Sequence, residues 1–165
     1  MATTEPLVQD TELNGFRGAP FPSNVVEAAA ESIRTDCEWH IAPSIQETLK
    51  VRGGGSVLLL PTLHLTAVAS IVDNHGYLVE GWEFFEDGTI ERHTGAFPRF
   101  VTVTFTHGYT QCPRELLQAI AERAASGAAG RIKSEALAGR SVALEGWYDP
   151  ATEGALVKYR LSGRP

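Results

Sequence analysis

Two cysteines and two histidines are spaced along the chain so that they could bind a metal ion. Cys37 precedes His40 by three residues, and His107 precedes Cys112 by five. Two thiolates and two imidazoles form a tetrahedral zinc set, so these residues could stabilise a small binding module or serve a metal-dependent enzyme. In the alternative, the cysteines are small apolar residues of a buried junction, and no cofactor is required. The lack of a Cys-x-x-Cys pair favours this alternative.

A cysteine nucleophile is a second chemical possibility. Cys112 could pair with His107 or His40 as nucleophile and base. A thiol needs a positive environment to ionise at neutral pH, and here only the nearby start of a helix offers one. We therefore favour a structural thiol at this position.

Four carboxylates gather around an expected hairpin, where two of them could act as the acid and base of a glycosidase. They are Glu83, Glu86, Asp87 and Glu91. A solvated, charged hairpin explains the same residues more simply. We therefore predict no catalytic residue and no cofactor.

The elements that position these residues meet at a strand–turn–helix joint. Residues 101–106 alternate between apolar residues and threonine, which is the period of a strand with one buried face. Gly108 marks a turn, and Pro113 suits the first position of a helix, where its missing N–H is not needed. His107 and Cys112 thus lie where a β segment returns to a helix.

Hydrophobic periodicity predicts an α+β fold. Apolar residues at helical spacing predict helices at about residues 24–38, 113–126 and 151–160. Short apolar runs separated by glycines predict an antiparallel β meander at about residues 57–106. We therefore expect a small helical bundle that carries an inserted β meander.

A hairpin is the clearest part of the expected meander. Asp87 and Gly88 form a typical turn pair between residues 82–85 and residues 89–92. Three aromatic residues of its first strand could anchor a neighbouring subunit or another partner. They are Trp82, Phe84 and Phe85. Whether Trp82 of the hairpin, and Trp147 nearer the C-terminus, lie in the core or at an interface stays open.

The length of 165 residues is that of one domain. We expect an extended arm at residues 1–22, a single domain at residues 23–145 and a C-terminal tail at residues 146–165. Two cysteines do not indicate a disulfide framework, and no apolar run is long enough to span a membrane. The first residues lack the pattern of a signal peptide. We therefore expect a protein of a reducing compartment with no membrane association.

Charge is distributed unevenly along the chain. The net charge of −6 argues against a protein that wraps nucleic acid by neutralising its phosphates. The first 130 residues hold 8 Lys and Arg against 16 Asp and Glu, whereas the remaining residues hold 6 against 4. The C-terminal part is therefore a candidate to contact an acidic partner surface.

Two segments resemble head-to-tail adaptor proteins of long-tailed actinobacterial phages. Residues 29–43 (AAESIRTDCEWHIAP) resemble the end of their first helix, and residues 101–113 (VTVTFTHGYTQCP) resemble the strand and start of their second helix. Residues 132–139 (IKSEALAG) and 157–160 (VKYR) are similar to the segment after that helix and to the short terminal helix. The resemblance covers about residues 24–161 and does not extend to the N-terminal arm.

The resemblance implies a structural subunit and not an enzyme. Adaptors of this family form a twelve-fold ring beneath the portal protein, and the ring receives a stopper or tail completion protein. DNA passes through the ring without sequence-specific binding. The resemblance thus implies a virion protein of the head–tail interface that is assembled in the host cytoplasm.

The resemblance also implies roles for particular residues, because the C-terminal segment of such adaptors tends to dock against the portal. The residues expected to dock are Trp147, Tyr148, Leu156, Tyr159, Arg160 and Leu161. Apart from the resemblance, the residues themselves predict a structural junction formed by Cys37, Trp39, His40, His107, Tyr109 and Cys112. An acidic body around a channel would repel DNA and let it slide.

Overall fold

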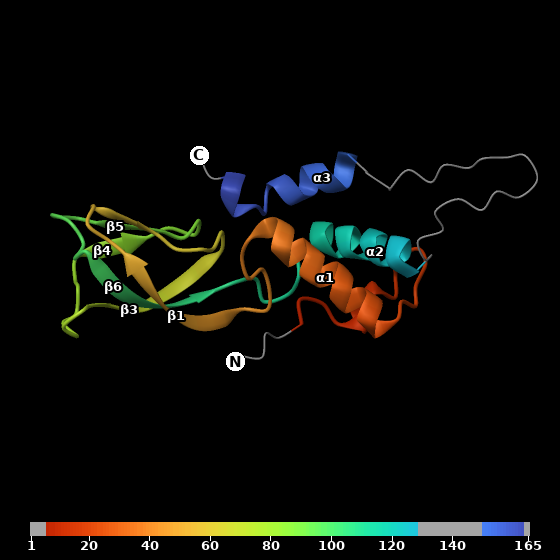
Figure 1. Ribbon diagram of the computed structural model, residues 1–165, viewed down its shortest axis with the longest axis horizontal. Coiled ribbons are helices and arrows are strands. Elements are labelled where there is room, and N and C mark those ends of the chain that lie inside the picture. The colour runs from red at the N-terminus through yellow and green to blue at the C-terminus, as the bar shows by residue number, and fades with distance from the viewer. Residues whose placement is uncertain (1–5, 129–149, 164–165) are drawn as a thin grey trace, which may run out of the picture. The chain divides into compact units, whose positions relative to one another are not determined.

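The chain folds into helices and antiparallel β sheets, which confirms the expected α+β class (Figure 1). The computed structural model describes residues 6–128 and 150–163. These residues form two compact units. The helical unit combines the residues up to Cys37 with those from Cys112 onward, and the β unit is the continuous segment 38–111.

The three α-helices of the helical unit begin within one residue of their expected positions, and two 3-10 helices, η1 and η2, were not expected. In the described residues they are η1 (Asp10–Leu13), α1 (Ser23–Cys37), α2 (Arg114–Ala128), α3 (Pro150–Val157) and η2 (Leu161–Gly163). Prolines precede α1 and α2. The carbonyl of Pro22 accepts hydrogen bonds from the first turn of α1, and that of Pro113 does the same for α2. The third helix ends at Val157, which is earlier than the expected end near residue 160.

Helices α1 and α2 pack against each other through faces rich in alanine. Ala30 and Ile33 are buried on α1, and Ile120 and Ala124 are buried on α2. Small side chains allow two helix axes to approach closely. At the edge of this packing, Arg123 Nη2 of α2 lies 2.5 Å from Asp36 Oδ2 of α1.

The segment before α1, which was expected to form an extended arm, contains the 3-10 helix η1. Leu7, Val8, Leu13 and Phe21 of this segment are buried. Helix η1 contacts α2 in the same unit. The described part of residues 1–22 therefore contributes apolar side chains to the core of the helical unit.

The β unit contains two three-stranded antiparallel sheets. Its strands are β1 (Ile45–Arg52), β2 (Val57–Leu59), β3 (Leu65–Asp73), β4 (Trp82–Phe84), β5 (Thr89–Arg92) and β6 (Phe100–His107). The first sheet has the order β1-β6-β3, and the second has the order β2-β5-β4. Strands β4 and β5 form a hairpin in which Trp82 lies opposite Arg92 and Phe84 opposite Ile90.

Strand β1 lies before the meander that was expected at about residues 57–106. It pairs with β6 without a break, from Ile45 opposite His107 to Arg52 opposite Phe100. Because β1 and β6 are the first and last strands of the unit, the first sheet is not a simple meander. The polar residue Glu47 interrupts the apolar alternation of β1, and this interruption hides the strand in the sequence.

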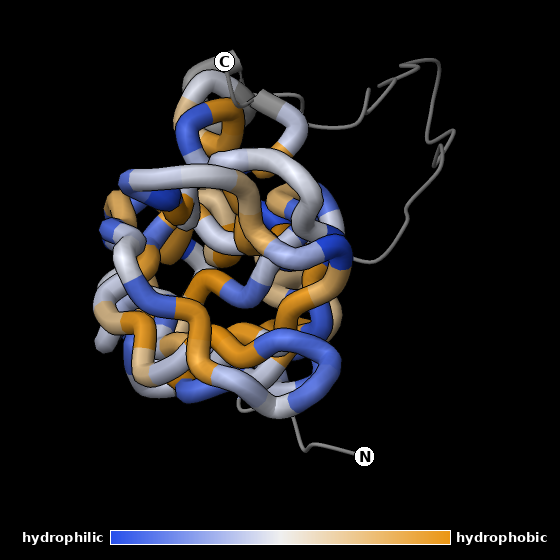
Figure 2. The backbone as a smooth tube through the Cα atoms, turned by 90° about the vertical axis from the view of Figure 1, so that its left-hand side faces the viewer, coloured by the Kyte–Doolittle hydropathy of each residue, from blue (hydrophilic) through white to orange (hydrophobic). Residues whose placement is uncertain are grey.

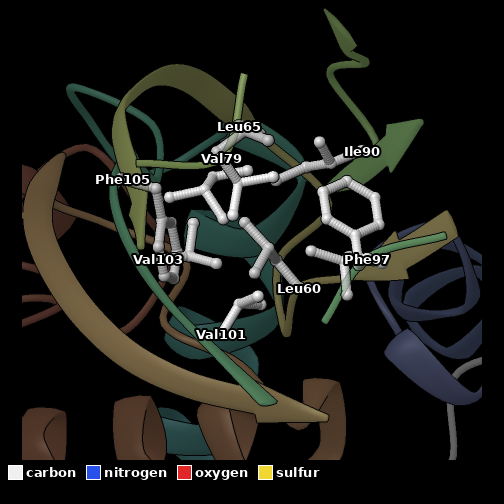
Figure 3. Packing of buried hydrophobic residues seen from close by; sticks show 10 residues of the cluster. Leu60, Leu65, Val79, Ile90, Phe97, Val101, Val103 and Phe105 are labelled. Atoms are coloured by element: carbon white, nitrogen blue, oxygen red, sulfur yellow. The ribbon is translucent and has the colours of Figure 1, made fainter. Parts of the chain in front are cut away.

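The core of the β unit lies between the two sheets (Figure 3). Val101, Val103 and Phe105 of β6 are fully buried and alternate with half-buried threonines. Their side chains point toward Leu60 and Ile90 from the region of the second sheet (Figure 3). One shared core thus holds the two sheets face to face.

Hydrophobic and hydrophilic residues alternate along the chain and do not gather in one long run (Figure 2). Within the described residues, no helix is both long enough and apolar enough to cross a membrane.

Candidate functional site

His107 is a buried histidine at the end of β6. Its side chain is 1% exposed, and its backbone lies between Ile45 of β1 and Leu65 of β3. Neither ring nitrogen has a hydrogen-bond partner in the described residues. The Nε2 atom lies 3.2 Å from Oε2 of Glu47, which is within ion-pair distance but without hydrogen-bond geometry.

Burial lowers the pKa of His107 below its ordinary value of 6.5. Removal from water disfavours the charged imidazolium, while the carboxylate of Glu47 favours it and opposes the shift only in part. The ring of His40 lies 5.7 Å from that of His107 and adds to the lowering. The ring of His107 is therefore a neutral part of the core at neutral pH.

The turn after His107 is fixed by backbone hydrogen bonds and by an aromatic stack. The N–H of Gly108 donates to the carbonyl of His64 at 2.9 Å, and that of Tyr109 donates to Ile41 at 2.8 Å. The rings of Tyr109 and His64 stack at 4.1 Å with an interplanar angle of 9°. Nε2 of His40 lies 2.6 Å from the carbonyl oxygen of Pro43. These backbone hydrogen bonds and ring contacts hold the turn in one conformation, so its role is structural.

Trp39 and Tyr109 complete this part of the β unit. Trp39 is buried, and its ring is tilted against that of Tyr109 at 6.2 Å. Burial, with a smaller contribution from the carboxylate of Glu86, raises the pKa of Tyr109. The phenol therefore remains protonated at neutral pH.

Cys37 and Cys112 are free, buried thiols of the helical unit. Burial, and next the carboxylate of Asp36, raises the pKa of Cys37 to about 11. Burial, and next the carboxylate of Glu12, raises the pKa of Cys112 to about 12. The thiolate is the form that attacks electrophiles and binds metals, so both cysteines are held in the unreactive form.

The zinc hypothesis draws its residues from both units. Cys37 and Cys112 belong to the helical unit, whereas His40 and His107 belong to the β unit. Within the part of the chain that the structure describes, no group of three or more His, Cys, Asp and Glu residues could hold a metal ion. The four side chains that the zinc hypothesis needs as donors have other environments. Cys37 and Cys112 are protonated thiols, Nε2 of His40 lies at a backbone carbonyl oxygen, and His107 is buried among apolar residues.

The residues expected to dock a partner at the C-terminus differ in exposure. Leu156 is fully buried in the helical unit, and Val157 beside it is 54% exposed. Tyr159, Arg160 and Leu161 are half-buried. Trp147 and Tyr148, the remaining residues of this set, lie outside the described residues.

The aromatic residues of the hairpin also divide into two kinds. Trp82 is half-buried against the core of the β unit, and its Nε1–H donates to the carbonyl of Val79 at 2.7 Å. Phe84 and Phe85 are 38% and 43% exposed. Trp82 thus contributes to the core, while the two phenylalanines offer apolar surface.

Two apolar residues on β2 are exposed, which the sequence pattern does not indicate. The apolar run at residues 57–60 is typical of a buried strand. In the structure only Leu58 and Leu60 are buried, whereas Val57 and Leu59 are 44% and 59% exposed. Four consecutive apolar residues carry no alternation, so the sequence does not show which of them face the core. The structure thereby adds a partly apolar sheet face to the candidate contact surfaces.

No protein-family model and no curated protein sequence matches the chain, but solved structures share its fold. One is a chain in the neck of an empty GTA (gene transfer agent) particle, computed with C6 symmetry. It is 20% identical, with a TM-score of 0.60 over 96% of this chain and 94% of that chain. Another is a chain in the neck of a native GTA particle, computed with C12 symmetry. It is 22% identical, with a TM-score of 0.58 over 86% of this chain and 85% of that chain.

Proposed function

We propose that this chain is a structural subunit of the neck of a tailed, phage-like particle. The observation that carries the proposal is the shared fold, which spans 96% of this chain and 94% of a chain in a GTA neck. The resemblance of residues 29–43 and 101–113 to phage adaptor proteins points to the same role. In this role the working parts of the molecule are contact surfaces, and the buried residues Cys37, His107 and Cys112 are structural parts of their own units.

The proposed place of the subunit is between the portal and a stopper or tail completion protein, in a ring of about twelve copies. A neck structure with this fold was computed with C12 symmetry. The excess of acidic residues suits a ring around DNA, because 16 Asp and Glu against 8 Lys and Arg in the first 130 residues would repel the phosphates. DNA could then slide through the ring without binding to it.

Portal docking is proposed for the C-terminal segment. Leu156 anchors α3 in the helical unit and so holds the segment in place. Val157 is exposed beside Lys158, whose Nζ lies 3.3 Å from Glu115 Oε1. A helix that is anchored on one side and presents an exposed valine on the other can dock without unfolding.

Native mass spectrometry of the chain mixed with the portal protein of the same particle tests the proposed function. We expect one portal ring to bind about twelve copies of this chain. A chain that does not bind the portal, or that binds in one or two copies, would contradict the proposal.

Two neighbouring substitutions separate docking from folding. Val157→Asp should abolish portal binding and leave the free energy of unfolding unchanged, because the side chain lies at the surface. Leu156→Ala should lower the free energy of unfolding by about 2–5 kcal/mol, because it leaves a cavity in the core. Full portal binding by Val157→Asp would show that α3 does not dock there.

A further inference from the structure

The outward face of the second sheet combines exposed apolar residues with carboxylates. Leu58 and Ile90 point into the core, so their strand neighbours point outward. The outward residues Val57 and Leu59 of β2 are exposed. Glu91 of β5 lies directly opposite Val57. We call this surface, completed by Glu83 and Phe85, the acidic face.

Two carboxylates of the acidic face oppose each other. Glu83 of β4 is the direct cross-strand partner of Glu91 of β5, and both are exposed. Like charges in directly opposite positions destabilise a sheet. No ion pair joins either of them to a cation in the described parts of the chain. A cation from outside the subunit would remove this repulsion.

The outward face of the first sheet carries the opposite charge. Val101 and Val103 of β6 point into the core, so Phe100 and Thr102 point outward, and their cross-strand partners Arg52 and Lys50 share that face. No Asp or Glu occupies an outward position on β1 or β6. We call this surface the basic face.

One cation of the basic face, Lys50, lies over an aromatic ring of the same face, and Arg99 lies near the same ring. Nζ of Lys50 lies 5.6 Å from the centre of the Phe100 ring, and Cζ of Arg99 lies 5.5 Å from it. Both distances allow cation–π attraction. Because Lys50 and Arg52 are exposed and lack an ion pair in the described residues, their charges remain available to a partner.

The two faces point away from each other. Both sheets pack on one core, so their outward faces lie on opposite sides of the β unit (Figure 3). One copy can therefore place its acidic face on the basic face of a second copy and still present its own basic face to a third. A contact of this head-to-tail kind closes into a ring when the rotation permits.

We infer that copies of this chain contact one another through these faces, with Glu83 and Glu91 of one copy against Lys50 and Arg52 of the next. The inference rests on the proposed ring and names the surfaces that close it. A second copy is the partner that fits, because the chain itself supplies both complementary charges. The apolar residues Val57, Leu59 and Phe85 would be covered by the same contact.

Two charge-reversed variants of the full chain test the inference. One carries Glu83→Lys and Glu91→Lys, so both of its faces are basic. The other carries Lys50→Glu and Arg52→Glu, so both of its faces are acidic. We expect the wild type to self-associate at low ionic strength, and each variant alone to associate at least about tenfold more weakly, as measured by sedimentation velocity.

A mixture of the two variants provides the decisive measurement. In a 1:1 mixture, every acidic face can meet a basic face if the two variants alternate, so association should return to the wild-type level. This rescue requires folded subunits and therefore excludes misfolding as the cause of the loss. Glu27→Lys, an equal change of charge per residue at an exposed position of α1, serves as a control and should associate like the wild type.

Three outcomes would overturn the inference. They are a wild type that stays monomeric at every concentration, variants that associate as the wild type does, and a mixture that does not recover. None of these outcomes affects portal binding, which tests the proposed function separately. A wild type that binds the portal in about twelve copies, together with variants that bind it in fewer, would support both proposals.

Discussion

At the scale of single residues, His107 shows how burial sets a pH limit on the fold. Its pKa is lowered by burial, so the folded protein binds fewer protons at this ring than the unfolded chain does. The contribution of the neutral His107 ring to the free energy of unfolding is therefore fully present above a pH of about 6.5, and it is lost as the pH falls below that value. Glu47 and His40 are the titratable groups that influence the ring, and their effects oppose each other.

We predict that His107→Phe weakens the pH dependence of stability. Between pH 7.5 and 5.5, the free energy of unfolding should fall by up to about 1 kcal/mol less in the variant than in the wild type. Urea titrations at both pH values measure the difference. The control variant His93→Gln changes an exposed histidine, so its free energy of unfolding should fall between these pH values by as much as that of the wild type. If the free energy of unfolding falls equally in the wild type and in His107→Phe, the buried ring of His107 does not cause the loss of stability at low pH.

The two cysteines give a second prediction at this scale. With pKa values of about 11 and about 12, Cys37 and Cys112 are ionised only to about 0.1% or less at pH 8, against roughly a quarter of a free thiol. Alkylation of the native protein by iodoacetamide should thus be at least about 100-fold slower than that of a cysteine peptide. Mass spectrometry counts the labelled thiols. Fast labelling without denaturant would contradict this assignment.

At the scale of elements, the turn after β6 depends on Gly108. Its φ is +92°, and a Cβ atom there would lie 2.9 Å from the carbonyl oxygen of Pro43. Gly76 has a similar φ of +84° but has no neighbouring atom within 4 Å of such a Cβ. The two glycines therefore share the backbone strain of a substitution and differ in steric contact.

We predict that Gly108→Ala destabilises the protein more than Gly76→Ala. The backbone conformation alone should cost about 1 kcal/mol at either position, and the close contact should raise the loss at Gly108 to at least about 2 kcal/mol. Denaturant titration measures both variants. Equal losses would mean that the loop at Pro43 yields readily to the added methyl group.

The elements also show which parts of the fold can be predicted from sequence. Strand β6 is evident because threonine alternates with Val101, Val103 and Phe105, and the helices are evident from their apolar spacing. The pairing of β1 with β6 cannot be predicted from the sequence, because Glu47 interrupts the apolar alternation of β1 and the two strands are distant in the sequence. The opposed carboxylates Glu83 and Glu91 also become neighbours only through strand register.

At the scale of the whole molecule, the β unit has the features of an independently folding domain. It is the continuous segment 38–111, with a core cluster of its own that draws on both sheets. Its ends are joined, because the N–H of Tyr109 donates to the carbonyl of Ile41 at 2.8 Å. The chain can therefore be cut at both ends without separating residues that are paired inside the unit.

We predict that a fragment of residues 38–111 folds on its own. It should show β structure by circular dichroism and unfold cooperatively in urea, with modest stability, because a domain of this size buries only about 60% of its unfolded surface. A fragment carrying Val103→Asp should not unfold cooperatively, because it buries an unpaired charge in the core. If the parent fragment is itself unfolded, the β unit depends on the helical unit for its stability. A folded fragment would carry both charged faces, and the charge reversals at Glu83, Glu91, Lys50 and Arg52 could then be examined without the helical unit.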